Sequence, residues 1–143
     1  MALPAPRPPA ANYVAVVNSG LLYFVSGQIP TDEGGVRFVG KVGRDFTVEA
    51  GRDAARLCAI NILAQLQSAL GELDRIARIV KVVGFVNAVP DFTDPQLVVN
   101  GASDFLVEVL GERGRHARSA VGVATLPLGV AVEVEAIVEA IPP

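Results

Sequence analysis

Residues 76–89 limit the fold most, because this segment has the pattern of a long β-strand that is apolar on both faces. From Ile79 onward, Lys81 is its only charge. Side chains alternate between the two faces of a strand. The two resulting sets are Val80, Val82, Gly84 and Val86 on one face, and Ile79, Val83 and Phe85 on the other. Such a strand belongs in a sheet that is covered on both sides.

The rest of the chain supplies two helices. The first is expected between the N-cap residue Thr47 and the stop at Gly71, and the second between Asp94-Pro95 and Gly111. Further strand patterns lie on both sides of these helices, with a turn at Ser19-Gly20 between the first two. These segments are 13–18, 21–27, 36–39, 118–124 and 130–141. The order predicts an α+β fold, a mixed β-sheet with two helices on one face.

Two helices can cover only one face of such a sheet. The second apolar face therefore needs another cover, and another copy of the chain is the expected one. The composition agrees, because 51% of the 143 residues are apolar and only 19% are charged. We therefore expect a homo-oligomer.

Several classes of site are not expected from the composition. A formal net charge of −3 gives no electrostatic basis for binding nucleic acid. The single cysteine, Cys58, and the single histidine, His116, support neither an intramolecular disulfide nor a Cys/His zinc site. We interpret Cys58 as a buried, inert thiol and His116 as a loop residue without an acidic partner.

The N-terminal residues 1–12 hold four prolines, and we expect them to form a mobile arm before a single domain at residues 13–143. Neither a secretory signal nor a membrane-spanning pattern is present, so no membrane contact is expected. A cytoplasmic, reduced setting is the corresponding expectation.

Arg118 is the first candidate for chemistry. Its same-face neighbours in the predicted strand, Ala120 and Gly122, are too small to fill the space beside it, and the valines of the strand are expected to face the core. A guanidinium with such space can bind a carboxylate through two hydrogen bonds. It can equally form a structural salt bridge with Glu133 or Glu135, and both interpretations stay open here.

Glu133 and Glu135 are expected on the face of the last strand opposite its core side chains. They are either solvated edge charges or a carboxylate that orients a water or accepts a proton. Asn100 on the second helix faces away from the core stripe, where an asparagine usually has no specific role.

Three segments together resemble one protein family. They are Ser26–Pro30 after a strand, Ala117–Val121 leading to Leu126-Pro127, and Val132–Ala136. This pattern resembles the RidA/YjgF family of reactive-intermediate deaminases, which are also called L-PSP endoribonucleases. The resemblance covers residues 13–141, whereas residues 84–104 depart from the deaminase prototype and indicate a divergent branch.

The resemblance implies a chorismate-mutase-like fold, assembled as a homotrimer with clefts between its subunits. It implies that Arg118 binds the substrate carboxylate and that Glu133 positions a water. The reaction would be hydrolysis of 2-imino or enamine acids to 2-oxo acids and ammonia, with no metal or cofactor. The other residues that it places at the cleft are Tyr13 on the ligand, Gly27 and Ala120 through their backbones, and Asn100 nearby. The prototype has a cysteine where this chain has Ala120.

Two other functions are weighed against the deaminase. In one, the trimer binds a small carboxylate without turning it over. In the other, the protein is a ribonuclease, which the acidic charge, the single histidine and the two tyrosines disfavour.

Overall fold

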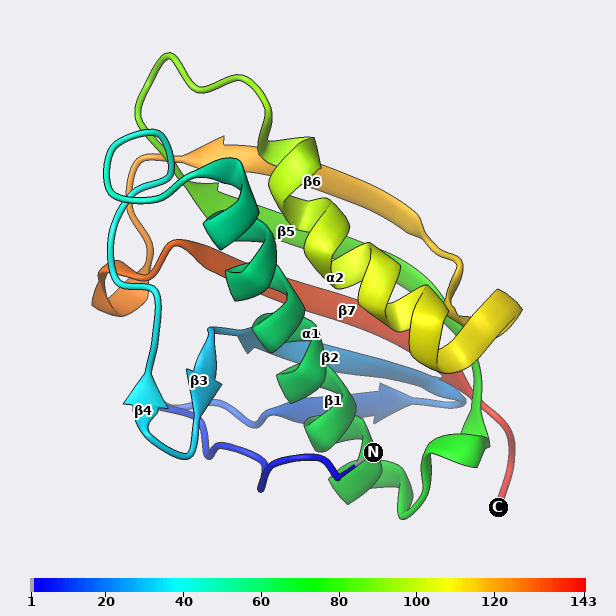
Figure 1. Ribbon diagram of the computed structural model, residues 1–143. Helices are drawn as coiled ribbons and strands as arrows, with labels where there is room; N and C mark the ends of the chain where they lie inside the picture. The colour runs from blue at the N-terminus through cyan, green and yellow to red at the C-terminus, as the bar shows by residue number, and fades with distance from the viewer. Residues whose placement is uncertain (1) are drawn as a thin grey trace.

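A computed structural model describes residues 2–143. The chain forms a mixed five-stranded β-sheet with both helices on one face (Figure 1). The strands follow the spatial order β1-β2-β7-β5-β6, and β5 and β6 are parallel while the other neighbours are antiparallel. Their bounds are β1 Val16–Ser19, β2 Leu22–Gln28, β5 Ile76–Asn87, β6 Ala117–Val123 and β7 Val132–Ala140. This arrangement confirms the α+β fold and the one-sided helix layer.

The other elements within residues 2–143 are two helices, a pair of short strands and three short 3-10 turns. The helices are α1 Val48–Leu70 and α2 Pro95–Leu110. The strands β3 Thr31–Asp32 and β4 Gly35–Val36 form a separate pair, and the single 3-10 turns are η1 Leu73–Arg75, η2 Gly111–Gly114 and η3 Pro127–Gly129.

The helix ends lie where the capping residues predicted them. The Thr47 side chain accepts a hydrogen bond from Ala50 N at 3.2 Å, and Gly71 ends α1 with φ of 89°. Pro95 is the first residue of α2, and Gly111 ends it with φ of 63°. Glycine adopts these positive φ values without steric cost, so both stops follow from the sequence.

The core lies between the helices and one face of the sheet. Side chains on one face of β5 and β7 point to α1 and α2 and are buried. On β7 the buried side chains alternate with more exposed ones, as the sequence predicts. The two helices pack closely because α2 has Gly101 against α1, where a Cβ would overlap the Arg52 carbonyl. The closely packed helices cover β5 and β7 from one side (Figure 1).

The opposite face of the sheet, which we call the open face, is uncovered within the chain and carries apolar side chains beside Glu133, Glu135 and Glu139 of β7. Cross-strand register places Phe24 on β2 beside Ile137 on β7, and Phe85 on β5 beside Val121 on β6. Phe24 and Val121 are 41% and 42% exposed. The one-sided helix cover predicted from the sequence is therefore present, and exposed apolar side chains remain on the open face.

Two face assignments from the sequence are wrong. The β5–β7 register shifts between Ile79 and Lys81, so Ile79 turns to the helix face and Val80 to the open face, against simple alternation. On β6 the predicted sides are exchanged, since Ala120 packs against the core and Val121 is exposed. The reason is that α2 lies over the Arg118 side of β6 and bonds to it.

The N-terminal arm lies against α1, where Gln65 Nε2 donates to the Arg7 carbonyl at 2.8 Å. Its mobility stays a prediction. Among the helices of residues 2–143, none is both long enough and apolar enough to cross a membrane.

Candidate functional site

The six site residues expected from the sequence fall into two separate groups. Tyr13, Gly27 and Glu133 line one hollow of about 560 Å³. Asn100, Arg118 and Ala120 lie elsewhere, between α2 and β6. We call these the glutamate half-site and the arginine half-site.

A β-bulge shapes the glutamate half-site. The β2–β7 register shifts between Val25 and Gln28, so Ser26 and Gly27 stand outside the regular ladder. The Glu133 carboxylate points at Gly27, where a Cβ would overlap it. Only glycine therefore leaves room for the carboxylate in this position.

Glu133 has an altered acidity. Burial raises the pKa of its carboxyl group above the ordinary value, and the negative charge of Glu135 raises it further. A carboxyl group with a raised pKa holds and releases a proton closer to neutral pH, which suits acid–base work.

The rim of the glutamate half-site comes from segments far apart in the sequence. Residues 7–10 of the N-terminal arm and Tyr13 line the hollow together with Pro127 and Leu128 of η3. Tyr13 is 48% exposed, so its ring is available to a ligand or to a second copy of the chain.

The arginine half-site is held by hydrogen bonds from α2. Arg118 Nη1 donates to Asn100 Oδ1 at 2.9 Å and to Ser103 Oγ at 3.1 Å, and Nη2 donates to the Gln96 carbonyl at 3.2 Å. Asn100 thus has a specific partner instead of being an exposed helical asparagine. Ala120, two residues along β6, supplies no polar side chain to this group.

Sequence reasoning missed two members of this group, Ser103 and His116. Ser103 Oγ lies 2.8 Å from His116 Nε2, and His116 Nδ1 lies 2.6 Å from the Gly114 carbonyl. The spacing indicates only shared faces, because Ser103 follows Asn100 by three residues on a helix and His116 precedes Arg118 by two in an extended segment.

Arg118 forms no salt bridge with Glu133 or Glu135 among residues 2–143, so the salt-bridge interpretation is wrong for the single chain. β5 separates β6 from β7, and the residues pair differently on it, Arg118 with Val82 and Glu133 with Phe85. Val82 is buried under the helices and Phe85 is on the open face. The two half-sites therefore face opposite sides of the sheet.

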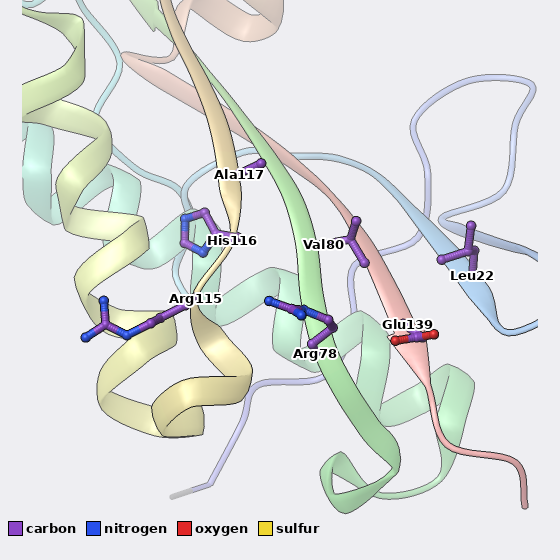
Figure 2. Close-up of a pocket in the computed structure, with 7 residues that line it drawn as sticks. All are labelled: Leu22, Arg78, Val80, Arg115, His116, Ala117 and Glu139. Carbon is purple, nitrogen blue, oxygen red and sulfur yellow. The ribbon is translucent and has the colours of Figure 1, made fainter.

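Another hollow, of about 630 Å³, lies at the other end of β2 and β7. Figure 2 shows that its lining residues come from several strands, with Leu22 on β2, Arg78 on β5 and Glu139 on β7. His116 also borders it, from the segment that leads into β6. None of the six expected site residues is among its lining residues.

Cys58 is fully buried, with its Sγ 3.6 Å from the Val132 carbonyl, and burial raises the pKa of its thiol. This is the environment of an inert thiol. In the part of the chain that the structure describes, no three His, Cys, Asp or Glu residues gather in a group that could hold a metal ion.

Comparison with known proteins places the chain in a family. A family model described as "YjgF/chorismate mutase-like, putative endoribonuclease" matches residues 2–139. Protein TCP17 of Trypanosoma cruzi is 53% identical over 138 residues, which is 96% of this chain and 86% of that protein.

Solved structures show the same relationship. The crystal structure of Atu1372 from Agrobacterium tumefaciens, at 52% identity, matches with a TM-score of 0.89 and covers 93% of this chain and 86% of its own. The structure of E. coli TdcF with bound serine, at 29% identity, matches with a TM-score of 0.67 and covers 94% and 92%. On the family model, the sequence identities and the fold, this chain belongs to the RidA/YjgF family and has its chorismate-mutase-like fold.

Proposed function

We propose that the protein hydrolyses reactive 2-imino and enamine acids to 2-oxo acids and ammonia, in clefts between the subunits of a homotrimer. In each cleft the arginine half-site of one subunit would meet the glutamate half-site of the next. No metal or cofactor takes part in the proposed reaction, and a cytoplasmic setting belongs to the same proposal.

The single observation that carries this proposal is that hydrogen bonds from α2 hold the Arg118 guanidinium and leave some of its N–H donors unused among the described residues. Three of its five N–H donors are engaged by α2 within residues 2–143, and the remaining two are Nε–H and one on Nη2. Nε and Nη2 form one edge of the planar group, and that edge matches the two oxygens of a carboxylate. This fixed orientation of the guanidinium supports the proposed binding of a small carboxylate at the arginine half-site.

Glu133 suits the second part of the reaction. Hydrolysis adds the oxygen of a water to C2 of the C=N bond, and the nitrogen takes up protons. The C2–N bond then breaks, ammonia leaves, and C2 becomes the carbonyl carbon of the 2-oxo acid. A carboxyl group with a raised pKa can accept a proton from the water and return it to the nitrogen.

The assembly is supported by the open face and by a relative. Exposed apolar side chains such as Phe24 and Val121 favour burial against other copies. TdcF, a relative of this chain, was solved with bound serine, a small α-amino carboxylate close in size to a 2-imino acid.

Turnover is tested by generating 2-iminobutanoate in situ and following its loss and the release of ammonia. We expect the wild-type protein to accelerate both, and Arg118→Ala and Glu133→Gln to abolish most of the acceleration while they stay folded and assembled. Arg118→Ala should also lose binding of 2-oxobutanoate, whereas Glu133→Gln should keep it. Wild-type turnover no faster than the buffer rate would contradict the deaminase.

Mixing the two inactive variants tests whether the site is shared. A cleft that takes Arg118 from a Glu133→Gln subunit and Glu133 from an Arg118→Ala subunit has both groups intact. Random mixing at equal amounts gives about a quarter of clefts of this kind, and thus about a quarter of wild-type activity. Mixtures no more active than the separate variants would contradict a site between subunits.

The alternative function, carboxylate binding without turnover, uses the same arginine half-site. It predicts binding of 2-oxobutanoate by the wild-type protein and no ammonia release. An RNA-cleavage assay on the same preparation checks the ribonuclease activity that the family description names.

A further inference from the structure

A continuous series of hydrogen bonds, which we call the histidine relay, joins His116, Ser103 and Arg118 between η2, α2 and β6. The distances are 2.6 Å from the Gly114 carbonyl to His116 Nδ1, 2.8 Å from His116 Nε2 to Ser103 Oγ, and 3.1 Å from Ser103 Oγ to Arg118 Nη1. The histidine relay ends at the Arg118 guanidinium, which the proposed function assigns to the substrate carboxylate.

The direction of each hydrogen bond follows from the chemistry of its end groups. The Gly114 carbonyl can only accept, so His116 Nδ1 carries a proton. The Arg118 guanidinium can only donate, so Ser103 Oγ accepts from it. The Ser103 hydroxyl proton is then donated to His116 Nε2, which accepts it as a neutral imidazole. Every hydrogen bond of the histidine relay therefore joins one donor to one acceptor.

The effect on Arg118 is to fix the rotation of its guanidinium. Asn100 Oδ1 and Ser103 Oγ take both protons of Nη1, so the plane of the group is set by two residues one helical turn apart on α2. Ser103 can serve as acceptor in this orientation because its own proton is held by His116.

We propose that neutral His116 is a positioning residue for carboxylate binding, which orients the Ser103 hydroxyl so that Ser103 and Asn100 hold the Arg118 guanidinium for the substrate. This inference rests on the proposed function of Arg118. It adds that carboxylate binding weakens when His116 takes up a second proton.

The reason lies in the hydrogen bonds of the imidazolium. Both of its nitrogens donate, so Ser103 Oγ would face two donors, and its own proton would lose its acceptor. The imidazolium would also share that oxygen with the positive guanidinium. Burial lowers the pKa of His116, the Gly114 hydrogen bond raises it, and the charge of Arg118 lowers it further, with a net shift below the ordinary value.

The other charges around His116 are mostly positive or already paired. Glu112 is paired with Arg115 at 3.0 Å, and Asp104 on α2 is paired with Arg52 at 2.9 Å. Arg78 and Glu139 line the hollow of Figure 2 together with His116. Lys81 on β5 lies opposite Ala117 of β6 in the strand register.

The single histidine of the chain allows a direct test by NMR. In ¹⁵N-labelled protein we expect the Nδ1–H tautomer at neutral pH, and a titration with a pKa below the ordinary value. Saturating 2-oxobutanoate should lower this pKa further, because a ligand that prefers the deprotonated form and the proton must oppose each other. An anion that is merely near His116 would raise the pKa instead, so a raised or unchanged pKa overturns the proposal.

Variants separate positioning from structure. Ser103→Ala should weaken 2-oxobutanoate binding about tenfold, since a hydrogen bond to a charged group is lost. His116→Gln keeps an acceptor that does not titrate, so its affinity for 2-oxobutanoate should not fall in acid. The exposed Ser68→Ala on α1 is the control and should bind as wild type.

The outcomes distinguish this inference from the proposed function. A wild-type protein that binds 2-oxobutanoate, with Ser103→Ala binding equally well, overturns only the positioning role. The same holds if His116→Gln keeps the acid loss of affinity. A wild-type protein that binds no 2-oxobutanoate between pH 5 and 8 overturns both proposals.

Discussion

Gly27 and Glu133 occupy adjoining space, because the bulge in β2 brings the glycine backbone under the carboxylate. Gly27→Ala should displace the Glu133 carboxylate and lower imine hydrolysis between about tenfold and a hundredfold, as misplacement of a reacting group does. The positive-φ glycines do not include Gly27, so the melting temperature should change little. Steady-state rates and thermal unfolding on one sample measure both effects.

Gly122→Ala is the control for this substitution. It adds the same methyl group to a strand where the nearest neighbouring atom, the Val86 carbonyl oxygen, is 4.0 Å away. Equal loss of activity in both variants would show that an added methyl group acts through the sheet and not through Glu133.

At the scale of single residues, the sequence predicted the exposure of some candidate residues but not their contacts. Strand alternation correctly separated Glu133 from the buried side of β7. It could not reveal that Asn100 and Ser103 bind Arg118, since that depends on where α2 lies over β6. The sequence indicates only a loop residue at His116, because its partners are a hydroxyl and a backbone carbonyl and no acidic residue marks them in the sequence.

At the scale of elements, the spacing of α1 and α2 controls the arginine half-site. Gly101 faces the Arg52 carbonyl, so Gly101→Ala should push the helices apart and lower the free energy of unfolding by about 1–3 kcal/mol. Because α2 carries Asn100 and Ser103, binding of 2-oxobutanoate should weaken in the protein that remains folded. Urea unfolding and calorimetric binding measure the two effects.

Glu108→Ala is the matched change on the exposed side of α2. It removes a surface ion pair with Arg56 at 3.3 Å and should cost less than about 1 kcal/mol. A Gly101→Ala protein as stable as Glu108→Ala would contradict the close packing of the helices.

The elements themselves were largely predictable, and their faces were not. Thr47, Gly71, Pro95 and Gly111 bound the helices through local backbone chemistry, which the sequence displays directly. The faces of β5 and β6 depend on a register shift and on the helix above, both of which are tertiary features. The position of β7 between β2 and β5 is likewise set by long-range pairing.

At the scale of the whole molecule, the open face should decide the oligomeric state. Val121 is exposed in the single chain, so Val121→Lys leaves the helix-side core intact but places a charge where another copy would pack. We expect light scattering to give a mass near the 14.9 kDa of one chain, against three times that value for the wild type. Circular dichroism should stay unchanged, and imine hydrolysis should be lost.

Ile141→Lys serves as the control, since Ile141 is 48% exposed beyond the end of β7. It should keep the wild-type mass and activity. A wild-type protein that already has the mass of one chain would contradict the assembly, and with it the site between subunits.

In the proposed assembly, a newly synthesised chain carries the open face unprotected until it meets other copies. Folding of the helix-side core is a first-order process, whereas the meeting of chains slows as their concentration falls. The lifetime of the unassembled chain is therefore set by how much of it the cell makes. At low expression, proteolysis of single chains competes with assembly, so the abundance of the chain, more than its folding stability, sets its working yield.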